Sequence, residues 1–168
     1  MYRFRKPPIH KGTDTWGETE YKRGEKNAMH FFMPMDKPPT VTAQEHKVKF
    51  IGGRPVFYDP PELAEAKDML CGTLNKHKPQ KPITEAVHLI TVWMFPAGKH
   101  KNGEWRTTKP DTDNLQKLLK DCMTKCGYWI DDAQVVWESV QKRWAKDKTG
   151  IYIEIRKLGK TVDDGEEP

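Results

Sequence analysis

The spacing of apolar residues along the chain predicts two helices. Between residues 113 and 126, leucine, methionine and cysteine recur at i, i+3, i+4, i+7, i+8 and i+11, which forms one core-facing stripe. Asp113 is expected to cap this helix, with Gln116 completing a capping box and Gly127 ending it. A second stripe, over residues 63–74, predicts another helix that opens at a pair of prolines.

Strand patterns supply the remaining elements. Residues 85–95 are apolar on both faces, as expected of a central strand. Residues 151–156 alternate isoleucine with polar side chains, and we expect this half-buried strand to pair with the one predicted at 134–144. Residues 30–35 are expected to form a short strand whose proline marks either a sheet edge or the end of the strand. Residues 47–58 are expected to form a hairpin that turns at two consecutive glycines.

This order of elements predicts an α+β fold, with a mixed β-sheet and helices packed on it. Residues 29–158 are assigned to this one domain. Residues 1–28 are polar and have no sustained period, so we expect a flexible N-terminal extension. Residues 159–168 are expected to form an acidic C-terminal tail.

Composition and charge favour a polyanionic partner. The chain has 168 residues and a net charge of +5, and residues 161–168 carry four acidic and no basic side chains, so the domain itself is more basic. Lysine and arginine displace counterions from phosphates, although charge for solubility would have the same sign. The chain has no apolar run near the roughly 18 residues of a membrane span. It also lacks a signal-peptide pattern, and its three cysteines are expected to be core thiols rather than zinc ligands, so we expect a cytoplasmic protein.

Two pairs of aspartates flank the first predicted helix. Asp111 and Asp113 stand at its start and Asp131 and Asp132 follow its end, so a chain that turns back after the helix could bring them together. Carboxylate oxygens are the ligands that Mg²⁺ prefers, along with substrate phosphate and water. Lys117 lies near the positive end of the helix dipole, a conflict that a bound phosphate would remove. Taken singly, these residues could equally be a helix cap, a solvated turn and a surface lysine.

The motifs around these residues resemble those of a known family. The block D-x-D-N-L-x-K from Asp111 to Lys117 and the block G-Y-W-I-D-D-A-Q-V from Gly127 to Val135 are similar to the RusA family of Holliday-junction resolvases. The resemblance implies a single RusA-like domain and a homodimeric, Mg²⁺-dependent endonuclease, with Mn²⁺ as a substitute. Such enzymes nick four-way DNA junctions symmetrically in recombination and repair, and the family is common in phages and prophages, so the resemblance implies a bacterial or phage-infected cell.

The resemblance also implies roles for individual residues. It makes Asp111, Asp113 and Asp132 the catalytic metal ligands, and Lys117 the catalytic lysine that stabilises charge on the phosphoryl oxygens. For Asp131 three roles stay open: it could be a further metal ligand, a residue that supports the ligands without contacting the metal, or a turn residue.

Seven basic residues are candidates for DNA binding. In the resemblance the predicted hairpin lies over the active site, and a basic loop at 96–106 leads directly to the aspartates. A plain surface hairpin and a mobile loop without contacts are the alternatives. The candidates are Lys47, Lys49, Arg54, Lys99, Lys101, Arg106 and Lys109.

Two other classes of function share some of these features. A D-x-D motif also occurs in glycosyltransferases that bind a metal and a nucleotide, but the sequence has no sign of a nucleotide pocket. A non-catalytic module that binds branched DNA would explain the basic domain. It would not explain the aspartates, which repel phosphate unless a metal is bound.

Overall fold

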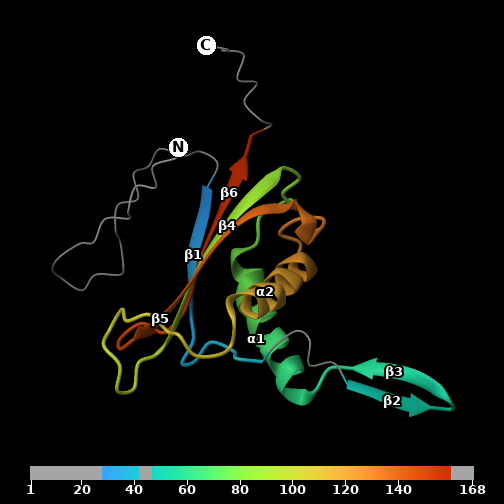
Figure 1. The fold of residues 1–168 in the computed structure, drawn as a ribbon. Coiled ribbons are helices and arrows are strands. Elements are labelled where there is room, and N and C mark those ends of the chain that lie inside the picture. Colours follow the sequence, from blue (N-terminus) through green and yellow to red (C-terminus); the bar gives the residue numbers. More distant parts are fainter. Residues whose placement is uncertain (1–27, 42–46, 160–168) are drawn as a thin grey trace, which may run out of the picture.

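The computed structural model describes residues 28–41 and 47–159, and it has the predicted α+β architecture (Figure 1). The extension predicted at 1–28 and the tail predicted at 159–168 lie almost wholly outside the described residues. The helices and strands are β1 (Ala28–Pro34), β2 (Lys47–Ile51), β3 (Arg54–Tyr58), α1 (Pro61–His77), β4 (Ala86–Pro96), α2 (Thr112–Cys126), the 3₁₀ helix η1 (Asp132–Gln134), β5 (Val135–Ala145) and β6 (Gly150–Leu158).

The main sheet has four strands in the order β1-β6-β4-β5. β6 is antiparallel to both β1 and β4, whereas β5 is parallel to β4, so the sheet is mixed as predicted. The central position of β4 and the edge position of β1 are confirmed. The predicted pairing of the last two strands is wrong, because β4 lies between them. The most apolar strand is buried best when it has a neighbour on each side, and the more polar β5 is left at the edge.

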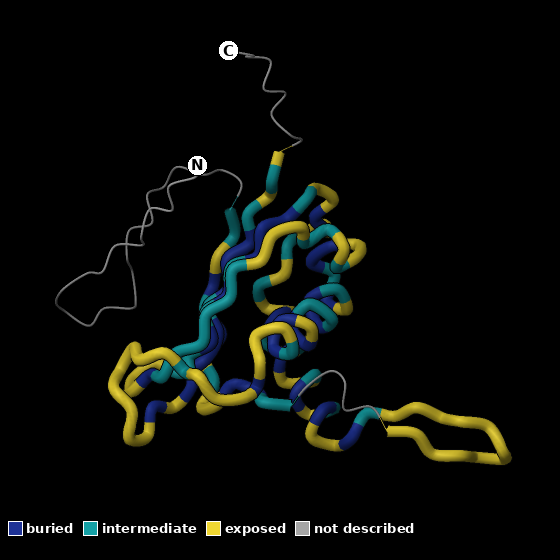
Figure 2. Tube along the Cα trace, in the orientation of Figure 1, coloured by how far each residue is buried: buried dark blue, intermediate teal, exposed yellow. Residues whose placement is uncertain are grey.

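The core lies between one face of this sheet and the two helices (Figure 2). Alternate residues of β4, from Val87 to Phe95, face the helices and are buried. On α2, the predicted stripe is buried along its full length, from Leu115 to Cys126. A buried hydrogen bond of 2.9 Å from the Thr91 hydroxyl to Gln116 Oε1 joins α2 to β4.

The start of α2 differs from the prediction. The helix begins at Thr112, so Asp111 is the N-cap residue, and Asp113 lies inside the first turn. Gln116 forms no capping box, because its side chain is buried against Thr91. The predicted stop at Gly127 is confirmed: this residue has a φ of 81°, in the left-handed region that favours glycine.

The three cysteines are free thiols. Cys122 and Cys126 are buried on the α2 stripe and Cys71 is half-buried on α1. Burial raises the pKa of Cys126 to about 11 and raises that of Cys122 further, so both stay protonated at neutral pH. Two of the thiols are thus part of the core, as predicted. Among the described helices, none is long and apolar enough to cross a membrane.

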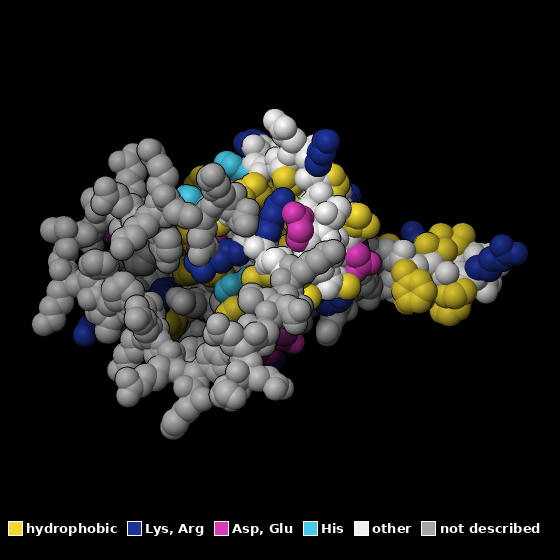
Figure 3. All heavy atoms as spheres, turned by 90° about the horizontal axis from the view of Figure 1, so that it is seen from above, with side chains coloured by type: hydrophobic (Ala, Val, Ile, Leu, Met, Phe, Trp, Pro, Cys, Tyr) yellow, Lys and Arg dark blue, Asp and Glu magenta, His cyan; other side chains and the backbone are white. Residues whose placement is uncertain are grey.

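The predicted hairpin is also confirmed, as β2 and β3 form a separate two-stranded sheet. It projects from the start of α1 and stands well away from the body of the domain (Figure 3). All ten of its strand residues are exposed.

Candidate functional site

The first pair of aspartates is presented at the N-terminal end of α2. Asp111 and Asp113 are both exposed. An aspartate at an N-cap ordinarily accepts a hydrogen bond from the first turn, but Asp111 makes no such bond. Neither carboxylate has a hydrogen bond or ion pair with any residue that the structure describes. Both groups are therefore free to bind something else.

Lys117 stands beside this pair. Asp113 and Lys117 are four residues apart on α2, so their side chains share one exposed face of the helix. The sequence had indicated the first turn of the helix for Lys117. Because α2 starts at Thr112, this residue instead lies in the second turn. Its ammonium group also has no partner within the described residues.

The second pair lies in the turn that leads into β5. Asp131 caps η1, and its Oδ1 accepts a 2.8 Å hydrogen bond from the Ala133 amide. Gln134 completes a capping box by accepting from the Asp131 amide, at 3.2 Å. Asp132 is half-exposed, and its carboxylate makes no polar contact within the described chain. Asp131 thus has a structural role in the turn, which leaves Asp132 as the better candidate ligand.

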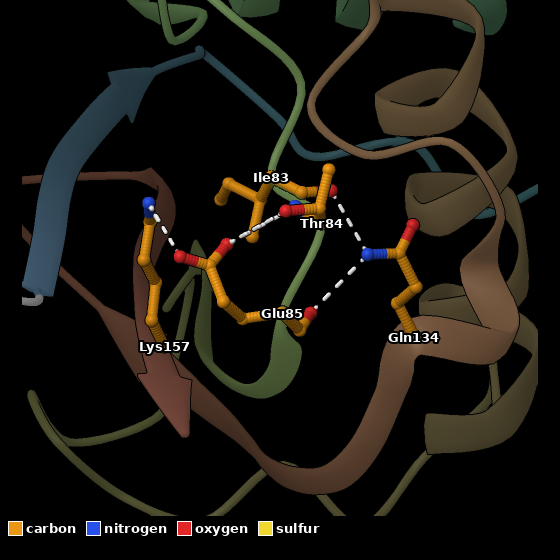
Figure 4. Close-up of polar contacts among 5 residues, drawn as sticks. All are labelled: Ile83, Thr84, Glu85, Gln134 and Lys157. Carbon is orange, nitrogen blue, oxygen red and sulfur yellow. Dashed lines mark hydrogen bonds and ion pairs between the residues drawn. The ribbon is translucent and has the colours of Figure 1, made fainter. Parts of the chain in front are cut away.

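Gln134 anchors this turn to the sheet (Figure 4). Its Nε2 donates to the carbonyl oxygens of Ile83, at 2.9 Å, and Glu85, at 3.2 Å. The side-chain carboxylate of Glu85 accepts a hydrogen bond from Lys157 Nζ on β6, at 3.3 Å. The position of Asp132 is therefore set by the strand ends and not by α2 alone.

The two pairs lie at opposite ends of α2 (Figure 1). β5 runs back along α2, from its C-terminal end towards its start. Glu138 of β5 pairs with Lys120 in the middle of α2, and further along β5 Lys142 contacts the carbonyl oxygen of Pro110, just before α2 begins. Asp132 precedes both β5 residues and so lies by the C-terminal end, and a helix of 15 residues is about 22 Å long. The expected convergence within one chain does not occur: in the described ranges, no three His, Cys, Asp or Glu side chains are grouped closely enough to hold a metal ion.

The basic loop before Asp111 is anchored to the second half of β5. Backbone hydrogen bonds join Trp144 to Glu104, at 2.8 Å, and Arg106 to Lys142, at 3.1 Å. Trp105 forms a bridge with Arg143, whose guanidinium lies 3.9 Å from the Trp105 ring centre. The loop is therefore anchored to the sheet, and contact of its basic side chains with DNA stays a prediction.

Arg106 is engaged inside the domain. Its guanidinium is 3.8 Å from the ring centre of Phe95 and 4.8 Å from that of Trp144, and it donates to the Lys109 carbonyl oxygen. Burial lowers its pKa from the ordinary value. These contacts hold the segment before Asp111 and leave little of Arg106 for phosphate. The other basic candidates, namely Lys47, Lys49, Arg54, Lys99, Lys101 and Lys109, are exposed.

Lys142 is the residue that sequence reasoning missed. Its ammonium group donates to the carbonyl oxygens of Thr108, at 3.0 Å, and Pro110, at 2.6 Å. It therefore fixes, from β5, the backbone that carries Asp111. The only signal in the sequence is a lysine in the second half of a strand, which also describes many surface lysines.

Replacing Lys142 with alanine is expected to lower the free energy of unfolding by about 1–2 kcal/mol, because two carbonyl groups lose a charged donor. Hydrogen exchange should accelerate in residues 108–115. Denaturant unfolding and exchange mass spectrometry would measure both effects. Lys148→Ala, at an exposed lysine, is the control; equal effects of the two substitutions would contradict this role for Lys142.

The fold and the site define a class: small α+β domains that display a D-x-D pair at the start of a helix packed against a mixed sheet. The family model described as endodeoxyribonuclease RusA matches residues 36–156, and the chain belongs to this family.

Curated relatives agree with this assignment. The crossover junction endodeoxyribonuclease rusA of Lactococcus phage r1t is 37% identical over 131 residues, which cover 76% of this chain and 97% of that protein. The crossover junction endodeoxyribonuclease RusA of Escherichia coli (strain K12) is 65% identical over 49 residues, or 29% of this chain and 41% of that protein. The protein of the same name from Enterobacteria phage 82 is 65% identical over a segment of the same length.

Proposed function

We propose that this protein is a Mg²⁺-dependent endodeoxyribonuclease that resolves four-way DNA junctions by paired symmetric nicks. The observation that carries the proposal is the free, exposed D-x-D pair with Lys117 beside it, in a chain of the RusA family. Its relatives from phages and bacteria are named as crossover junction endodeoxyribonucleases. The same comparison supports the further proposal of a role in DNA recombination and repair, in the cytoplasm of a bacterial or phage-infected cell.

The donor groups suit a hard divalent cation. Asp111, Asp113 and Asp132 offer carboxylate oxygens that have no partner in the described chain, and Mg²⁺ prefers such ligands. Mn²⁺ takes similar oxygen ligands and would be a substitute. Bound there, the cation would polarise a phosphoryl oxygen and lower the pKa of water.

The chain's own groups orient and stabilise the substrate. Lys142 holds the backbone immediately before Asp111, which keeps the start of α2 and its carboxylates in place on the domain. Lys117, on the same helix face as Asp113, is placed to balance negative charge that develops on the phosphoryl oxygens. Asp131 holds the turn that carries the half-exposed Asp132 by accepting a hydrogen bond from the Ala133 amide.

A homodimer would unite the two ends of α2. Because one chain keeps its aspartate pairs apart, we infer that Asp111 and Asp113 of one protomer act with Asp132 of its partner. Beside Asp132, the side chains of Ile130, Val136 and Trp137 are 70%, 64% and 56% exposed. Exposed large apolar side chains are a feature of protein interfaces.

The position of β5 supports the same inference. β5 is an edge strand of the four-stranded sheet, and the basic loop contacts only its second half, from Lys142 onward. The first half of β5 is therefore open to a second copy of the chain, both through its exposed apolar side chains and through the edge of the sheet. Paired active sites related by two-fold symmetry suit the symmetry of a four-way junction.

Incubation with a synthetic mobile four-way junction tests the proposed function. With Mg²⁺, we expect symmetric nicks near the branch point, none in the presence of chelator and none in a linear duplex of the same sequence. Cutting of every substrate would mean a general nuclease. Junction binding without cutting would contradict the enzymatic proposal and leave a branched-DNA-binding module.

A further inference from the structure

Among the residues that the structure describes, the β2–β3 hairpin has no element to pack against. Residues 47–58 make no hydrogen bond or ion pair with the rest of the described chain. An isolated two-stranded hairpin is marginally stable in water. Phe50 and Phe57 are nevertheless 73% and 70% exposed. Such a surface is expected to be covered by a partner.

The strand register gives the hairpin two different faces. Val48 lies opposite Phe57 and Phe50 lies opposite Pro55, so these four side chains form an entirely apolar face. Phe50 and Phe57 are diagonal neighbours on it, within reach of each other. We call these residues the apolar face.

The opposite face carries the three basic residues of the hairpin together with Ile51, Val56 and Tyr58, and we call it the basic face. The basic residues are Lys47, Lys49 and Arg54, and the Lys49 ammonium lies 5.4 Å from the ring centre of Tyr58. The hairpin contains no acidic residue, so its charge is complementary to a polyanion. Figure 3 shows hydrophobic side chains along the hairpin and a basic side chain near its tip.

We propose that the apolar face of the hairpin packs on unstacked bases at the centre of a branched DNA, while the basic face contacts the adjoining phosphates. Flat aromatic rings beside cations are the usual means of binding bases whose stacking is interrupted. An intact duplex hides the faces of its bases, whereas a branch point exposes them. Charge complementarity favours DNA over a second copy of this basic chain. This inference rests on the proposed function and names the part of the substrate that the hairpin reads.

A four-way junction with 2-aminopurine at the branch point tests the proposal, with chelator present to prevent cleavage. The unmodified chain is expected to raise the fluorescence, because the base is unstacked. The double variant Phe50→Ser/Phe57→Ser should lose this rise and bind the junction about tenfold or more weakly, with duplex affinity nearly unchanged. The variant Phe50→Trp/Phe57→Trp, which keeps two aromatic rings on this face, should bind the junction about as tightly as the unmodified chain.

Val56→Ser is the matched control, because it removes an apolar side chain from the opposite face of the same hairpin. It should leave the fluorescence rise intact. Circular dichroism and thermal unfolding of the Phe50→Ser/Phe57→Ser variant should match those of the unmodified chain, since the hairpin does not contact the core.

Two results would overturn the proposal. Equal losses of junction and duplex affinity would mean that the face does not read the branch point. A smaller species in sedimentation of the Phe50→Ser/Phe57→Ser variant would mean that the face joins two copies of the chain. If the unmodified chain cuts junctions but the Phe50→Ser/Phe57→Ser variant binds them normally, only this inference fails. Failure of the unmodified chain to cut with Mg²⁺ concerns the proposed function instead.

Discussion

The Asp113→Asn variant is expected to bind four-way junctions with nearly unchanged affinity and to lose cleavage by about three orders of magnitude or more. A ligand lost from a site that stabilises transition-state charge forfeits several kcal/mol, and each 1.4 kcal/mol is about tenfold in rate. The carboxylate is exposed and has no partner in the described chain, so folding does not depend on it. The substitution removes only the favourable interaction of the Asp113 charge with the positive end of the α2 dipole. This lowers the free energy of unfolding by less than about 1 kcal/mol.

The control for this experiment is Asp121→Asn, the same change on the same helix, at a half-buried position away from its N-terminal end. It should cleave as the unmodified chain does. Single-turnover cleavage with saturating protein separates the chemical step from binding, and thermal unfolding checks the fold. Equal cleavage by Asp113→Asn and the unmodified chain would remove this residue from the active site.

Mixed dimers are expected to recover activity from two inactive chains. If each site takes Asp113 from one protomer and Asp132 from its partner, a dimer of one Asp113→Asn chain and one Asp132→Asn chain keeps one intact site. Each homodimer has none. Two affinity tags on co-expressed chains allow the mixed species to be purified, and nicking of one strand per junction measures its single site.

The reverse combination makes the test decisive. A dimer of an unmodified chain and a chain carrying both substitutions has no intact site when sites are shared, but has one when each chain forms its own. Activity of this dimer, together with inactivity of the mixed single variants, would contradict the shared site. It would require Asp132 to move from the end of α2 where the structure places it.

Much of the fold could be predicted because local patterns carry it. The α2 stripe has a helical period and Gly127 has the conformation that ends a helix, so both are visible without any long-range contact. The alternation in β6 and the glycine turn between β2 and β3 are equally local. The motif residues of the candidate site were also found from sequence, through resemblance more than through spacing.

The start of α2 was harder to predict from the sequence, because two interactions compete for the Gln116 side chain. Gln116 could cap the helix in isolation, but in the folded chain its side chain is buried against Thr91 on β4. The N-cap then falls at Asp111, two residues earlier than predicted, and the Asp111 side chain makes no capping hydrogen bond. Arg106 was likewise expected to face DNA, but its guanidinium packs between Phe95 and Trp144, which a basic loop sequence does not reveal.

The sequence by itself determined which segments are helices and strands, and which residues are the candidates for the chemistry, because hydrophobic period and motif spacing are properties of neighbouring residues. Only the tertiary structure decided that β4 separates β5 from β6, and that β5 runs back along α2 with Lys142 beside Pro110. Those contacts join residues far apart in the chain, and they are selected by burial of the whole core. The same packing keeps Asp111 and Asp132 at opposite ends of α2, so under the proposed function the site needs a second chain to be complete.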